Sequence, residues 1–120
     1  MLLNNFFTID LIQQNDKDIN GSISLNVDHP IYKGHFPSQP VVPGVCMMQI
    51  IAELATAALG KELSIKKANQ AKFLIPIIPD KTPKLAIKIN YSELEEGQLK
   101  VTGSIYKEEL IFFKFKGILA

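Results

Sequence analysis

The segment that most constrains this fold is a proline-rich loop that leads directly into an apolar helix. Residues 34–45 contain three prolines. Proline holds φ at about −65° and has no N–H donor, so this segment cannot form a central strand or a helix interior. Residues 45–59 are then apolar almost throughout, and Gly60 supplies a helix stop. We therefore expect a stiff loop that carries His35 to the start of a buried helix, with Pro43 in the first turn.

Three polar side chains interrupt the apolar helix at regular spacing. Gln49, Glu53 and Thr56 are separated by four and then three positions, which places them on one narrow stripe of the helix. One interpretation is that this stripe is the face of the helix that contacts water. The alternative is that it lines a polar site within apolar surroundings, and the histidine loop just upstream favours this second interpretation.

The loop sequence Gly-His-Phe-Pro-Ser-Gln-Pro-Val-Val-Pro-Gly-Val at residues 34–45 resembles the signature of the 3-hydroxyacyl-(acyl carrier protein) dehydratases of type II fatty acid synthesis, which have the hot-dog fold. Residues 28–33 resemble that family's segment before its histidine, and residues 71–80 resemble the strand and turn that follow its helix. The similarity covers roughly positions 20 to 92 in the family's order. It implies an α+β hot-dog fold, in which an antiparallel sheet wraps one long central helix.

The hydrophobic pattern leads to the same architecture. Stretches that are rich in apolar residues or alternate between apolar and polar positions predict about six strands joined by short, hairpin-length turns. Such a sheet must cover its apolar face, and the apolar helix is the element able to do so. The expected strands lie at residues 6–13, 22–27, 64–74, 84–90, 99–105 and 110–118.

The resemblance also implies a set of site residues. His35 corresponds to the catalytic base, and an imidazole can accept a proton near neutral pH. Backbone N–H groups near Pro43, Gly44 and Val45, at the positive end of the helix dipole, would hold the thioester oxygen, and Gly44 would let the substrate approach closely. Tyr32 and Phe36 flank His35 and would either help to wall the acyl tunnel or pack in the core. In the family, the carboxyl group opposite the histidine comes from the partner subunit's helix, so each active site is shared.

This chain departs from the family at the acidic position. The family carries an acidic residue fourteen positions after its histidine and commonly a glutamine four positions later, whereas this chain has Gln49 and Glu53 at these positions. Glu53 could supply the carboxyl group, with its pKa raised by apolar neighbours, or the proton donor is absent. We expect a hydro-lyase that converts 3-hydroxyacyl thioesters into trans-2-enoyl thioesters in fatty acid or related biosynthesis. A hot-dog thioesterase and a non-catalytic acyl-thioester binding protein are the alternatives.

Composition narrows the class of protein. The chain has 120 residues, which suits a single domain over residues 1–120, and 47% of them are hydrophobic. The formal net charge is +1, from 13 basic and 12 acidic residues, so no electrostatic footprint for nucleic acid is present. The single cysteine, Cys46, fits a reducing compartment and is expected to be a small buried side chain. No metal site or cofactor is expected, because His29 and His35 have no carboxylate cluster beside them.

Partners and location follow from similar reasoning. The N-terminal residues lack a signal-peptide pattern, and residues 45–59 are too few to span a bilayer, so we expect a cytoplasmic protein that does not enter membranes. The acyl thioester would be carried on acyl carrier protein or on coenzyme A. Residues 110–118 contain a long apolar run that suggests burial on both faces, so a second copy should cover part of the outer surface in a homodimer or larger homo-oligomer. Lysines that could meet an acidic carrier protein are Lys66, Lys67 and Lys72.

Overall fold

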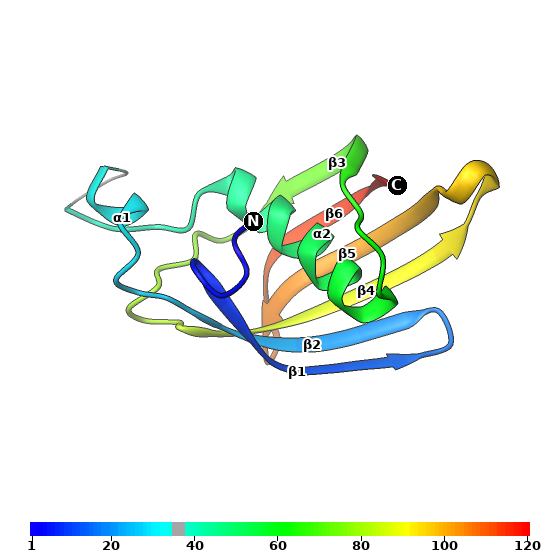
Figure 1. Cartoon of the computed structure of the whole chain (residues 1–120). Coiled ribbons are helices and arrows are strands. Elements are labelled where there is room, and N and C mark those ends of the chain that lie inside the picture. Colours follow the sequence, from blue (N-terminus) through cyan, green and yellow to red (C-terminus); the bar gives the residue numbers. More distant parts are fainter. Residues whose placement is uncertain (35–37) are drawn as a thin grey trace.

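In the computed structural model, which describes residues 1–34 and 38–120, one sheet curves around one long helix (Figure 1). The long helix is α2 (Gly44–Leu59), and a single short turn, α1 (Ile31–Gly34), precedes it. A 3₁₀ turn, η1 (Glu95–Gly97), joins two strands. The strands are β1 (Phe7–Asn15), β2 (Asp18–Leu25), β3 (Ile65–Phe73), β4 (Lys84–Glu93), β5 (Leu99–Lys107) and β6 (Leu110–Leu119).

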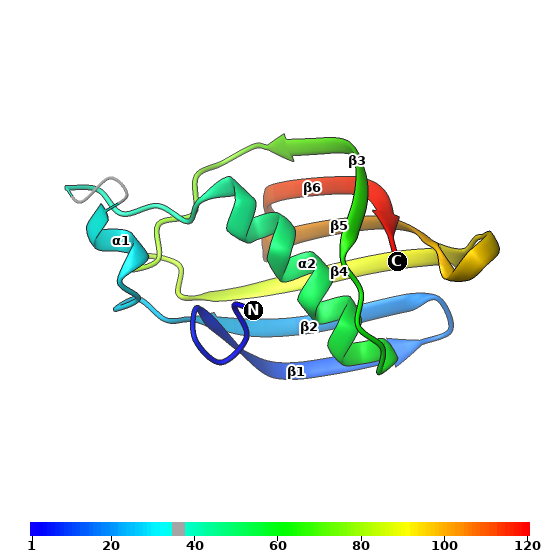
Figure 2. The same ribbon diagram turned by 45° about the horizontal axis from the view of Figure 1, so that its top comes forward.

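The sheet has the order β1-β2-β4-β5-β6-β3, and every neighbouring pair is antiparallel. Figure 2 shows α2 running diagonally across one face of the sheet, from the side of β3 toward β1. The chain then returns along β3, which pairs with β6 at the far edge. The predicted antiparallel sheet is confirmed, but it is not a simple meander, because β3 pairs with β6 at the edge while β2 pairs directly with β4.

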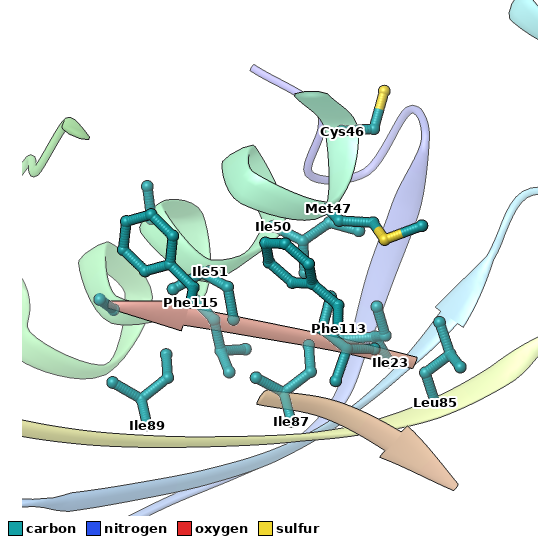
Figure 3. Close-up of a cluster of buried hydrophobic side chains, with 14 of the residues drawn as sticks. Ile23, Cys46, Met47, Ile50, Ile51, Leu85, Ile87, Ile89, Phe113 and Phe115 are labelled. Atoms are coloured by element: carbon teal, nitrogen blue, oxygen red, sulfur yellow. The ribbon is translucent and has the colours of Figure 1, made fainter. Parts of the chain in front are cut away.

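The core lies between α2 and the inner face of the sheet (Figure 3). Ile50, Ile51 and Leu54 on the helix are fully buried, and each such side chain contributes about 1.5–3 kcal/mol of burial free energy. Pro43 was predicted to lie in the first turn of the helix. The helix instead begins at Gly44, and Pro43 is the N-cap residue, in extended geometry (φ −61°, ψ 143°). The other end of the helix is closed by Gly60 in the left-handed conformation, as expected.

The first hairpin is tighter than predicted. Residues 14–21 were expected to form a loop, but β1 runs to Asn15 and β2 starts at Asp18, with Asn15 paired to Asp18 in register. Asp16 makes the sharp turn possible because it adopts a positive φ of 56°, a conformation that aspartate tolerates better than most residues. Polar residues could extend these strands because the hairpin forms an exposed edge of the sheet.

The prediction that residues 110–118 are apolar on both faces holds for the start of the strand, where the adjacent Phe112 and Phe113 are both buried, but not for the rest. In β6, Phe113 and Phe115 are fully buried on the inner face, whereas Lys114 and Lys116 point outward and are exposed. Strand β4 alternates in the same way. Beyond Phe113 the outer face of β6 is therefore basic, whereas Leu110 and Ile111 at its start are exposed apolar side chains.

Two smaller points complete the fold. The four-residue helix α1 was not predicted, because a single turn leaves no periodicity to detect in the sequence. Within the described residues, no helix is both long and apolar enough to cross a membrane.

Candidate active site

The polar stripe of α2 centres on a carboxylate that is buried and fully engaged. Glu53 is 3% exposed and is the one buried charged residue in the part of the chain that the structure describes. The backbone N–H of Leu2 donates to both of its oxygens, at 3.0 and 2.8 Å, and the N–H of Leu3 donates to Oε1 at 2.7 Å. Gln49 Nε2 donates to Oε2 at 2.8 Å. The N-terminal turn and the helix are thereby tied together through one side chain.

These contacts fix the orientation of the Gln49 amide. A carboxylate can only accept hydrogen bonds, so the NH₂ group of Gln49 must face Glu53. The carbonyl oxygen, Oε1, is therefore directed away from Glu53. Gln49 thus presents an acceptor toward the space beside the helix, and Glu53 determines which end of the amide is presented.

The stripe lines a cavity of about 320 Å³ between α2, the N-terminal turn and the segment before β3. Thr56, the third member of the stripe, accepts a hydrogen bond from Leu63 N at 3.0 Å and donates one to Leu63 O at 3.3 Å. Gln49, Glu53 and Thr56 therefore face one cavity. The other lining residues are Met1, Glu62, Leu63 and Ser64.

The start of α2 holds a second group of the predicted site residues, Pro43, Gly44 and Val45. The first-turn N–H groups, at Gly44 and Val45, receive no side-chain cap from Pro43, and such groups favour a negatively charged or polarised oxygen. Gly44 also packs closely against Phe73: a Cβ there would lie 2.8 Å from Cε1 of the Phe73 ring, so the ring would have to move. About five residues separate these amides from Gln49, or about 7 Å of helix rise.

An exposed apolar patch surrounds this end of the helix. Val45 is 72% exposed and Phe73 is 53% exposed, and Phe73 stacks on Phe113 with ring centroids 4.9 Å apart. Leu74 and Ile75 continue the patch beyond β3 and are also exposed. Adjacent exposed apolar side chains at an unpaired sheet edge are typical of a surface that another chain covers.

His35 and Phe36 lie outside the described residues, so their roles stay predictions. Tyr32, which the sequence places beside His35, does lie within the described residues. Its side chain is 5% exposed, and its hydroxyl has no hydrogen-bond partner among the described residues. Burial, with smaller effects from Cys46 and Asp80, raises the pKa of Tyr32. Burial also raises the pKa of the Cys46 thiol, which agrees with the predicted buried, unreactive side chain.

Comparison with known proteins gives consistent results. A family model of the ApeI-like group, described as ApeI dehydratase, matches residues 11–110. The 3-hydroxyacyl-[acyl-carrier-protein] dehydratases FabZ of Rickettsia africae and Rickettsia bellii are each 38% identical over 74 residues, which cover 60% of this chain and 50% of the relative. The chain therefore spans about half the length of the curated relatives it matches.

Solved structures share the architecture. The dehydratase heterocomplex ApeI:P from Xenorhabdus doucetiae gives a TM-score of 0.71 at 23% identity, covering 93% of this chain and 96% of the other. A putative thioesterase from Ralstonia eutropha JMP134 gives 0.59 at 17% identity, with 91% and 82% covered. These likenesses confirm the predicted hot-dog fold.

Proposed function

Because this chain belongs to the ApeI-like dehydratase family, we propose that it converts 3-hydroxyacyl thioesters into trans-2-enoyl thioesters in fatty acid or related acyl-chain biosynthesis. The acyl group is carried on acyl carrier protein, as in the reaction for which the FabZ relatives are named, or on coenzyme A. The structural observation that carries the proposal is the Gln49–Glu53 pair, which faces a cavity on the helix whose uncapped first turn supplies oxyanion donors.

Two steps of the reaction are assigned as the sequence predicts. His35 takes a proton from C2 of the acyl chain, since an imidazole is a competent base near neutral pH. The first-turn N–H groups of Gly44 and Val45 hold the thioester oxygen, which becomes negatively charged as that proton leaves. Phe36 and Pro43 contribute to the wall of the acyl site.

Glu53 acts as the positioning residue for Gln49. Its carboxylate already accepts hydrogen bonds from Leu2, Leu3 and Gln49, so a proton on either oxygen would displace one of these N–H donors. The arrangement instead leaves the Gln49 carbonyl free to accept a hydrogen bond from the 3-hydroxyl of the substrate. We assign Gln49 to hold that hydroxyl and Glu53 to hold Gln49.

An amide has no proton to exchange near neutral pH, so the departing hydroxyl needs another proton source. We infer that His35 supplies it. The proton taken from C2 stays on the imidazolium and passes to the 3-hydroxyl, which leaves as water. The C2–H and C3–O bonds break, the C2=C3 double bond forms, and the histidine returns to its neutral form.

A homodimer with shared sites fits this arrangement. The apolar patch at Val45, Phe73, Leu74 and Ile75 adjoins both the unpaired edge of β3 and the start of α2. A second copy that covered this patch would bring its own helix close to the first copy's loop. The resemblance implies the same sharing, in which the histidine of one subunit faces the helix of the other.

The test is the pH dependence of trans-2-enoyl thioester hydration and of the reverse reaction, on acyl carrier protein. With one group serving as base and acid, dehydration kcat/KM should rise with pH through a single ionisation and then stay level. His35→Ala should lose at least about 10²-fold in kcat/KM. His29→Asn is the control, because His29 serves the turn before α1, where Nδ1 accepts a hydrogen bond from Ile31 N at 3.1 Å.

Other outcomes would redirect the assignment. A bell-shaped profile whose upper limb disappears in Glu53→Gln would make Glu53 the general acid. Release of free thiol from a saturated acyl thioester, which cannot be dehydrated, would indicate a thioesterase. Saturable binding of an acyl thioester without turnover would indicate the non-catalytic role.

A further inference from the structure

The outer face of the sheet carries most of the positive charge of the protein. Strands β3, β4, β5 and β6 contain nine of the 13 basic residues but one of the 12 acidic residues, Glu93, which lies at the end of β4. The chain as a whole is nearly neutral, so its charges are segregated. Seven of these lysines occupy outward positions, as the strand register and burial pattern show: Lys67, Lys72, Lys84, Lys88, Lys100, Lys114 and Lys116.

This arrangement opposes folding slightly rather than favouring it. Lys72 on β3 lies directly opposite Lys114 on β6, and like charges in directly opposed positions of an antiparallel pair are destabilising. None of the seven lysines forms an ion pair with a described residue. A face that keeps unpaired like charges side by side attracts anions.

A cavity of about 270 Å³ lies at the centre of this face. Lys88 on β4 and Lys114 on β6 flank it, because both are aligned with Ser104 on the strand between them. Two strand spacings therefore separate their backbones, or about 10 Å. Lys116 lies in the next row. We call this cavity the lysine groove; its rim is Lys88, Lys114 and Lys116, and its floor includes Asn90, Thr102 and Ser104.

The floor of the groove, like its rim, can bind negatively charged oxygens. The Thr102 and Ser104 hydroxyls and the Asn90 amide can each donate a hydrogen bond, although Asn90 Nδ2 already donates one to Asp18 Oδ1 at 2.9 Å. The lysine stems supply apolar walls while their ammonium groups stay in water. Three cations around neutral donors match the oxygens of a small molecule that carries several negative charges.

We propose that the lysine groove binds a small polyanion of the phosphate class, such as a phosphorylated metabolite. The site is on the face of the sheet opposite α2, so it is separate from the proposed active site and does not rest on the proposed reaction. A second copy of this chain is a poor occupant, because it would bring lysines against lysines. Single-stranded nucleic acid is also disfavoured, since Phe115, the aromatic residue among those that line the groove, is fully buried and cannot stack on a base.

The test uses inorganic pyrophosphate as the probe, with the intact protein at low ionic strength. Titration calorimetry should show one saturable site, and amide signals of β4, β5 and β6 should shift in NMR spectra. Lys88→Gln/Lys114→Gln should weaken binding about tenfold or more. The matched control is Lys66→Gln/Lys107→Gln, which removes the same charge from the same sheet without altering the groove and should change the affinity less than about twofold.

Thermal unfolding of both double variants verifies that they are folded. Equal weakening by the two pairs would overturn the proposal, because it would show that pyrophosphate responds to net charge alone. Absence of saturable pyrophosphate binding, together with binding of poly-glutamate, would also overturn it and would identify the face as a docking surface for an acidic protein. Failure of the dehydratase assay leaves this binding measurement unaffected.

Discussion

Two carboxylates of this protein make contacts of equal length in opposite surroundings. Glu53 is 3% exposed and accepts hydrogen bonds as short as 2.7 Å from backbone N–H groups. Glu93 accepts one of 2.7 Å from Lys17, but the two side chains are 67% and 44% exposed. Contact distance alone does not distinguish them, whereas burial does.

The difference teaches how each kind of charge contributes to the molecule. Water competes little for Glu53, so its contacts determine structure: they attach the N-terminal turn to α2 and orient Gln49. Water and salt compete strongly for Glu93, so its ion pair has little effect on which structure forms. The proposed active site therefore depends on the interior carboxylate, and the surface charges are available for recognition.

The largest effect should come from removing the buried carboxylate. Glu53→Ala leaves the N–H groups of Leu2 and Leu3 and the Gln49 amide without their acceptor, and hydrogen bonds to charged groups contribute about 1.5–3 kcal/mol each. We expect the free energy of unfolding to fall by about 3 kcal/mol, measured by urea denaturation. Glu62→Ala, an exposed carboxylate that lines the same cavity, should change it by less than about 0.5 kcal/mol. Equal losses would contradict the comparison.

Tyr32 sharpens the comparison because its hydroxyl, like Glu53, is buried but, unlike Glu53, has no hydrogen-bond partner among the described residues. Replacing it with phenylalanine keeps the ring, which packs 5.7 Å from that of Phe6, and removes only the hydroxyl. An unsatisfied buried polar group costs about 1–3 kcal/mol, so Tyr32→Phe should raise the free energy of unfolding by about 1 kcal/mol. A lower free energy of unfolding, measured by urea denaturation, would mean instead that the hydroxyl has a hydrogen-bond partner outside the described residues.

Much of the fold could be predicted because its signals are local. The apolar run of α2 and the alternation of Leu85, Ile87 and Ile89 with polar residues in β4 each identify an element and its buried face. The place of β3 could not be predicted this way. The pairing of β3 with β6 depends on where the chain emerges from α2 after the helix has crossed the sheet. That position is a property of the packed structure rather than of any short segment.

The candidate site, too, could be predicted in part only. The spacing of Gln49, Glu53 and Thr56 placed them on one stripe, and the structure shows that the stripe faces one cavity. No sequence pattern indicates that the backbone amides of Leu2 and Leu3 donate to Glu53, because these groups are about fifty positions away in the chain. Side-chain patterns reveal which residues share a face, but they do not reveal which distant N–H groups will satisfy a buried acceptor.

The smallest effect should come from Glu93→Gln, and it should depend on pH and salt. The hydrogen bond with Lys17, followed by its charge, lowers the pKa of Glu93 below the ordinary value of 4.5. A carboxyl group whose pKa is lower in the folded state stabilises the protein above its unfolded pKa, and this contribution is lost as the pH falls through the folded value. Wild type should therefore exceed Glu93→Gln slightly in urea midpoint near neutral pH.

That difference should disappear once the pH has fallen through the lowered pKa of Glu93, and it should shrink in about 1 M NaCl, where charges are screened within a few ångströms. The variant retains Lys17 over the Tyr91 ring, 5.2 Å from its centroid, so the measurement isolates the ion pair. Glu109→Gln, on the exposed turn between β5 and β6, is the matched control and should show no such pH dependence. A difference that persisted at low pH or in high salt would mean that Glu93 contributes as an interior group does, contrary to its exposure.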